Sequence, residues 1–113
     1  MPANYLSAGD LDRRVTLQAR STSMDSFGQQ LTTWTVAFDA WARVTPLTGR
    51  ELLAAQAIVP ETTHEVVIRY RASTSPGMRV VYAGRVLDVR AVLDEDSAHV
   101  QQQLLCSEGL TQG

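Results

Sequence analysis

The chain has 113 residues, of which 44% are hydrophobic and 19% are charged. This length and composition are typical of a single globular domain with a modest core. The formal net charge is −2, whereas a general nucleic-acid-binding protein has a basic face and a high pI. Because Cys106 is the only cysteine, an intramolecular disulfide is excluded. The N-terminal residues lack the pattern of a signal peptide, and no apolar run approaches the ~20 residues that cross a bilayer. We therefore expect a soluble protein, made in the cytoplasm and not bound to a membrane.

The first half of the chain contains segments in which apolar and polar residues alternate with the two-residue period of β-strands. A polar lead at 1–12 precedes a predicted strand at 13–20. Residues 21–30 are rich in Ser, Asp and Gly, which predicts a loop. Residues 31–36 are dense in β-branched and aromatic side chains and predict a second strand. Residues 37–44 form either a third strand or a bent continuation of the second.

The alternation stops in an insert at residues 45–63. Pro46 removes a backbone donor and Gly49 permits a positive φ, so we expect the strand to end here. Residues 52–58 are helix formers, but Pro60 limits them to under two turns. Such a short helix is ordered only by packing against another element. Irregular segments of this length in small domains tend to be functional or disordered.

The strand pattern resumes after the insert. We predict a strand, a hairpin with its turn at Ala83 and Gly84, and a last strand, at residues 64–71, 78–93 and 98–108. Turns are predicted at 72–77 and 94–97, and a tail at 109–113. About six short strands predict an all-β fold, a small antiparallel β-barrel or sandwich that forms one domain over residues 1–113. Its long central loop carries a short helical segment.

The same alternation assigns one face of each strand to the core. A strand that is half buried carries apolar side chains at every second position. The expected scaffold core consists of Val15, Leu17, Trp34, Trp41, Val66, Ile68, Tyr70, Val80, Leu87, Val89 and Leu104.

Residues able to support catalysis or metal binding are few and scattered. His64 and His99 lie far apart and lack the spacing of metal ligands. Cys106 lies in an apolar alternating run, which favours a buried inert thiol over a nucleophile. The acidic residues 94–96 are explained by a solvated turn. We therefore expect no catalytic residue, metal or cofactor, and a protein that is not an enzyme.

A platform for single-stranded nucleic acid, similar to an OB-fold, is an alternative. Trp34, Trp41, Tyr70 and Tyr82 could stack on bases, although core packing also explains them. The arginines of the second half interleave with acidic residues, which favours cross-strand ion pairs over a basic patch. All ten basic residues are arginine, a residue favoured at protein interfaces. A bias in genomic base composition would also favour arginine over lysine. The arginines therefore have two explanations, of which a role in protein interactions is one.

Seven stretches, in this order, cover nearly the whole chain: GDLDRRVTLQ (9–18), DSFGQ (25–29), TW (33–34), WARVTPLTGRELLAAQ (41–56), THEVVIRYR (63–71), PGMRVVYAGRVLDV (76–89) and LLCSE (104–108). Together they resemble the head–tail joining proteins of phages, which are the head-closure or stopper proteins of long-tailed phages. The resemblance implies a small β-barrel that forms a ring in the virion, below the portal and its adaptor. That ring closes the DNA-filled head after packaging and presents a face to which the tail attaches.

The resemblance also implies the partners. These are further copies of the chain in a ring of twelve, with six as the alternative, the portal-side adaptor, and a tail terminator or tail-completion protein. Double-stranded DNA passes through the channel without sequence-specific contacts. A slightly acidic chain suits a channel lining, because strong phosphate contacts would hinder the passage of DNA.

The resemblance further implies that the insert at 45–63 faces the channel or a neighbouring subunit. The expected gating or intersubunit residues are Leu47, Thr48, Gly49, Arg50, Glu51, Leu52 and Gln56. Arg50 and Glu51 either pair across subunits or remain solvated charges. Two other roles stay open: an adaptor or tail-completion ring that has no gate, and the OB-like binder.

Overall fold

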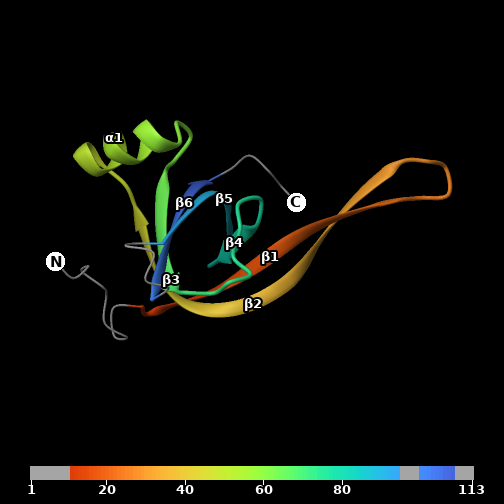
Figure 1. Cartoon of the computed structure of the whole chain (residues 1–113), viewed down its shortest axis with the longest axis horizontal. Helices are drawn as coiled ribbons and strands as arrows, with labels where there is room; N and C mark the ends of the chain where they lie inside the picture. Colours follow the sequence, from red (N-terminus) through yellow and green to blue (C-terminus); the bar gives the residue numbers. More distant parts are fainter. Residues whose placement is uncertain (1–10, 95–99, 109–113) are drawn as a thin grey trace.

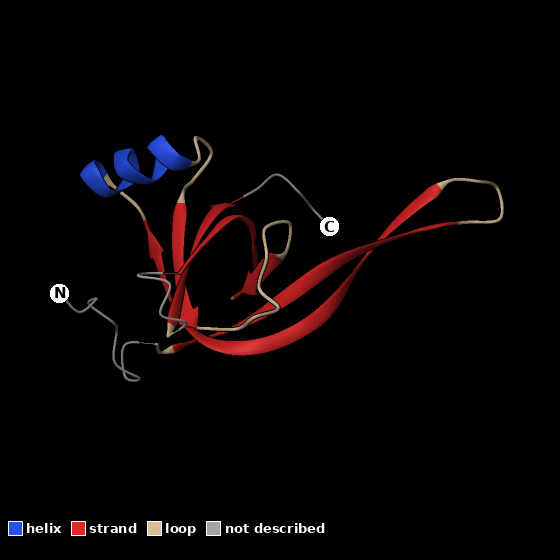
Figure 2. Cartoon of the chain, in the orientation of Figure 1, coloured by secondary structure: helices blue, strands red, loops and turns tan. Residues whose placement is uncertain are grey.

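A computed structural model describes residues 11–94 and 100–108, which form one sheet and one helix (Figures 1 and 2). The six strands are antiparallel to their neighbours and close into a barrel in the order β1-β2-β3-β6-β5-β4. In chain order the elements are β1 (Arg13–Met24), β2 (Gln30–Pro46), α1 (Gly49–Ile58), β3 (His64–Arg69), β4 (Arg79–Tyr82), β5 (Arg85–Asp94) and β6 (Gln101–Glu108). The predicted all-β fold of about six antiparallel strands is confirmed.

The two strands predicted at 31–36 and 37–44 are one continuous strand, β2. The bent continuation is therefore the correct alternative. The pairing of β1 with β2 shifts register between Leu17 and Gln18, which leaves Ala37 of β2 without a partner. Such a β-bulge bends its strand and raises the local twist. The bulge lies where β2 leaves the barrel.

Beyond the barrel, β1 and β2 continue as a long hairpin (Figure 1). β1 pairs with β4 only through residues 16–18, and β2 pairs with β3 only through residues 42–46. Residues 19–36, called the hairpin arm below, therefore pair only with each other. The radius of gyration is 15.0 Å, above the ~13 Å of a compact domain of this length.

The prediction of a loop at 21–30 was wrong, because the small polar residues of this segment pair across the arm. The hydroxyls of Ser21 and Thr33 lie 2.8 Å apart, and such pairs stabilise a sheet much as apolar pairs do. The turn is closed by Asp25, whose carboxylate accepts the backbone N–H groups of Phe27 and Gln29 at 2.9 and 2.8 Å. Residues 21–30 therefore contain the end of β1, a short turn and the start of β2, although their composition is typical of a loop.

Inside the barrel, the core is formed by apolar side chains from all six strands and from the segment before β4. Its buried members are Val15, Leu17, Phe38, Ala42, Val66, Ile68, Met78, Val80, Leu87, Val89, Leu104 and Cys106. Eight of the eleven expected core residues are in this set.

The two tryptophans and Tyr70 are not part of this core. Alternation along β2 points Ala42 inward, so the neighbouring Trp41 faces outward and is 55% exposed. Trp34 lies on the hairpin arm beyond the bulge, half-buried, with the guanidinium of Arg79 4.3 Å from its ring centre. Tyr70 follows the last residue of β3 and is half-buried outside the core cluster.

Replacing Leu104 by Ala should lower the free energy of unfolding by about 2–5 kcal/mol, because the side chain is fully buried in the barrel and its loss leaves a cavity. Chemical denaturation measures this change. Leu53→Ala is the matched control: its side chain is 69% exposed on α1, so its effect should stay within about 0.5 kcal/mol. Equal losses in the two variants would contradict this description of the core.

Candidate functional site

Helix α1 occupies the middle of the insert and lies on the outer face of the barrel (Figure 2). It is longer than the helical segment predicted at 52–58, since it begins at Gly49, where the backbone φ is +58°. Its buried face places Ala55 against Leu47 and Leu105, with Leu52 partly buried beside them. A helix of this length does not form alone in water, so this contact with its own barrel orders it.

Polar contacts at both ends brace the insert. Before α1, the backbone N–H of Leu47 donates to the carbonyl of Thr63 at 3.0 Å. After it, the side-chain amide of Gln56 donates to the carbonyl of Thr62 at 3.2 Å. The hydroxyl of Thr62 in turn donates to the carbonyl of Val59 at 2.8 Å. The insert is thus a fixed element of the fold.

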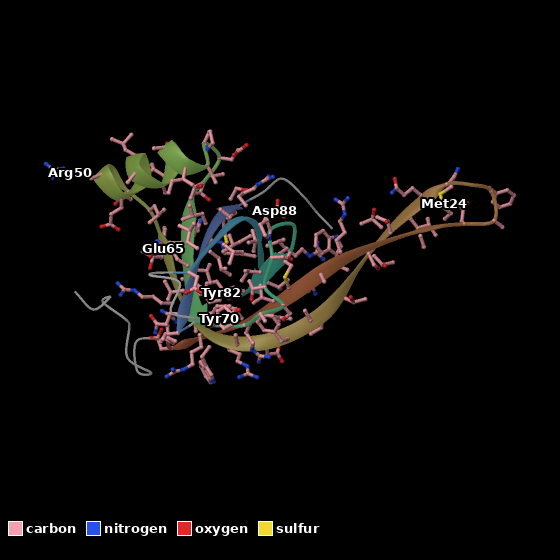
Figure 3. The ribbon with its side chains drawn as sticks, viewed as in Figure 1. Met24, Arg50, Glu65, Tyr70, Tyr82 and Asp88 are labelled. Carbon is pink, nitrogen blue, oxygen red and sulfur yellow. The ribbon has the colours of Figure 1, made fainter. Side chains whose placement is uncertain are left out.

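The expected contact residues of the insert divide into two groups. Leu47 is buried, and Leu52 and Gln56 are half-buried, so these three hold the helix in place. The other four are exposed at the start of the helix, namely Thr48, Gly49, Arg50 and Glu51. Figure 3 places Arg50 at the outer end of α1, pointing away from the barrel.

The exposed surface of α1 also carries apolar residues that the sequence analysis did not select as contact residues. Leu53 is 69% exposed and Ile58 is 59% exposed. The helical spacing in the sequence could have indicated the exposure of Leu53, because a helix over 49–58 turns Leu53 away from Leu52 and Ala55. Between the helix and the sheet lies a small groove of about 220 Å³, lined by Leu47, Glu51, Ala54, Ala55, Ile58, Glu65, Leu93, Gln103 and Leu105.

A polar cluster anchors the point where the insert re-enters the barrel. The Thr63 hydroxyl lies 2.9 Å from Nδ1 of His64 and accepts the backbone N–H of Glu108 at 2.8 Å. Arg85 Nε donates to the Glu108 carboxylate at 2.6 Å, and the same guanidinium lies 3.5 Å from Nε2 of His64. The cluster links the ends of β3, β5 and β6.

Burial lowers the pKa of His64, and the positive charge of Arg85 lowers it further, while Glu108 acts in the opposite direction. Hydrogen bonding to Arg85 lowers the pKa of Glu108. The neutral imidazole is therefore the form that fits the folded state.

The remaining candidate groups for chemistry are the Cys106 thiol and possible metal ligands. Burial raises the pKa of the Cys106 thiol to about 12, so the thiol stays protonated and inert at neutral pH. Across residues 11–94 and 100–108, no group of three or more His, Cys, Asp or Glu residues is placed to hold a metal ion. Nor does the described part of the chain contain a helix long and apolar enough to cross a membrane. His99 and the acidic residues 95 and 96 lie outside the described residues.

Stability should fall as the pH drops through the ordinary histidine pKa of 6.5. The sign follows because folding lowers the pKa of His64, so the unfolded chain binds the proton more readily. His64→Gln should weaken this dependence, which melting temperatures between about pH 7.5 and 5.5 measure. His99 is present in both proteins and cancels in the comparison. Parallel pH profiles would contradict the assignment.

Comparisons with known proteins agree with a structural role. The sequence matches the family of phage head completion proteins over residues 6–109. It is 27% identical over 109 residues to head completion protein gp7 of Enterobacteria phage HK97, covering 92% of this chain and 97% of that protein.

Two solved structures have a similar fold. The solution structure of protein SF1141 from Shigella flexneri 2a is 29% identical, with a TM-score of 0.78 that covers 95% of this chain and 100% of that chain. A chain from the virion of a native gene transfer agent particle is 18% identical, with a TM-score of 0.59 over 86% of this chain and 93% of its own, and this likeness concerns the fold alone. The resemblance to head–tail joining proteins is thereby confirmed, and the chain belongs to the phage head completion protein family, a family of structural virion proteins.

Proposed function

We propose that the protein forms a ring in the head–tail connector, which closes the DNA-filled head and gives the tail a face to attach to. The observation that carries the proposal is the solvent-exposed surface of α1. Leu53 and Arg50 are exposed on the side that faces away from the barrel, and Ile58 and Glu51 are exposed beside the groove against the sheet. Apolar residues on a rigid element, rimmed by charges, are typical of protein–protein contacts.

In this proposal, the exposed residues of α1 contact a neighbouring subunit of the ring. Leu47, Leu52 and Gln56 position the helix, while Thr48, Arg50, Glu51, Leu53 and Ile58 make the contact. Twelve copies form the ring, with six as the alternative, between the portal-side adaptor and a tail terminator or tail-completion protein. DNA passes through the ring, and the charge of −2 supports passage without tight phosphate binding.

The bracing of the insert also favours a second role, that of an adaptor or tail-completion ring without a gate. A plug that opens must leave its closed position, and α1 would then expose Leu105, which is 2% exposed beneath it. Burying such a leucine contributes about 1.5–3 kcal/mol, so any opening carries this cost. DNA retention by the ring then depends on its contacts rather than on a swinging loop.

Particles from cells that lack the protein should consist of heads that have lost their DNA and carry no tails. A double variant, Leu53→Asp with Ile58→Asp, should give the same particles although the chain still folds, since both side chains are exposed. Electron microscopy and the DNA content of purified heads measure the defect. This variant separates function from folding better than a deletion of 48–58, which would uncover Leu105.

The melting temperature of the purified double variant should stay close to that of the unchanged protein. Ser75→Asp, an exposed change in the turn before β4, is the matched control and should give normal particles. DNA-filled, tailed and infectious particles from the α1 double variant would refute the contact role of this helix.

A further inference from the structure

The hairpin arm is a two-stranded ribbon whose outer edges pair with no other strand among residues 11–94 and 100–108. Residues 19–24 of β1 and 30–36 of β2 pair only with each other in this part of the chain. An isolated two-stranded hairpin is marginally stable in water. Open strand edges and exposed apolar side chains together are features that a second chain covers.

The tip of the arm presents an apolar surface. Phe27 is 88% exposed, Met24 is 69% exposed and Leu31 is 45% exposed. The charge of Asp25 is engaged within the tip, since its carboxylate accepts the N–H groups of Phe27 and Gln29. The surface that covers this tip must therefore accept an aromatic ring, by apolar contact or by stacking against arginine.

The chain carries such a surface near the start of β1, called the Trp41 groove below. It has a volume of about 740 Å³ and is lined by Leu11, Asp12, Arg14, Asp39, Ala40, Trp41, Arg69 and Arg71. The guanidinium of Arg14 lies 5.5 Å from the ring centre of Trp41 and 3.7 Å from the Asp39 carboxylate. Tryptophan and arginine are the residues that most often dominate binding energy at interfaces.

The tip and the groove lie far apart in the molecule. Figure 1 shows the start of β1 on the barrel, on the side away from the arm, and the arm tip at one end of the long axis, and Figure 3 places Met24 near that tip. From Gln30 to Trp41, β2 extends through eleven residues, or about 36 Å of strand. The tip therefore meets a Trp41 groove only when the groove belongs to another copy.

We propose that the arm tip of each subunit, with Phe27 at its centre, docks in the Trp41 groove of a second copy of this chain. Such a contact joins two different surfaces of identical subunits, and its repetition produces a ring when the rotation closes. The inference rests on the proposed ring and deepens it, because it names the two surfaces through which neighbours meet.

A disulfide between engineered cysteines tests the contact in assembled particles. The variant carries Ser26→Cys beside Phe27 at the tip and Asp12→Cys at the lining of the Trp41 groove, two exposed positions that leave Phe27 and Trp41 in place. The native Cys106 does not interfere because it is buried in the core. A disulfide needs Cα atoms within about 7 Å, so the two positions cannot pair within one chain. Oxidised particles should give a ladder of cross-linked multimers on a gel without reductant, since each subunit has one tip and one groove.

The controls are the two single variants and the pair Val36→Cys with Asp12→Cys. Val36 is 63% exposed but lies at the base of the arm, so this pair should remain monomeric on the gel. Dimers from Ser26→Cys alone would overturn the proposal, because they indicate tip-to-tip contact. Tailed, DNA-filled particles without cross-links would overturn the docking and leave the connector role intact. Absence of the protein from the particles would overturn both.

A second variant keeps the proposal testable without disulfide chemistry. Phe27→Asp should leave the melting temperature unchanged, because the ring is exposed in the single chain. It should reduce the yield of infectious particles by about 30-fold, the loss expected for a residue that contributes about 2 kcal/mol to binding. Phe27→Leu keeps an apolar tip and should retain most of the yield. Normal yield with Phe27→Asp would contradict the docking.

Discussion

Closure of the barrel determines which parts of the chain remain available to partners. The sheet closes where β1 pairs with β4 through only three residue pairs, and the core then fills the space between the strands. Closure removes the open edges of a sheet, so within the described residues the barrel offers few sites for another chain. The hairpin arm is the exception, because β1 and β2 continue past the point of closure. Because the β-bulge at Ala37 bends the strand, the part of β2 after Ala37 belongs to the barrel and the part before it belongs to the arm.

The sequence predicted the barrel well because its signal is local. Val15 and Leu17 in β1 alternate with the polar residues Arg14, Thr16 and Gln18, and both have the burial that this period requires. The first part of the arm was not predicted as a strand, because Ser21 and its neighbours have the composition of a loop and only cross-strand pairing, as with Thr33, makes them a strand. The exposure of Trp41 was not predicted for a different reason. Its size suggests a core residue, but the position of Ala42 in the alternation decides which side chain points inward.

The insert shows the same division between local signal and tertiary contact. Pro46 and Gly49 predicted where the strand ends, and the residues that follow predicted a helix. That the helix packs on its own barrel through Ala55 and Leu105 depends on β6, some fifty residues later in the chain, and no local pattern contains this information. In the proposed ring, a helix fixed on the outside of the barrel contacts a neighbouring subunit through its exposed residues Leu53 and Ile58, and not through the buried ones.

The account describes a rigid barrel with two groups of exposed contact residues, those on α1 and those at the ends of β1 and β2. Its central claim is that copies of the chain meet through these surfaces in a connector ring. Imaging the connector of DNA-filled, tailed particles at a resolution that traces the backbone tests it most directly. We predict a closed ring in which each arm tip lies at the Trp41 groove of a neighbouring copy and the exposed surface of α1 is covered. A map in which the arms extend away from neighbouring copies, with α1 facing solvent, would contradict it.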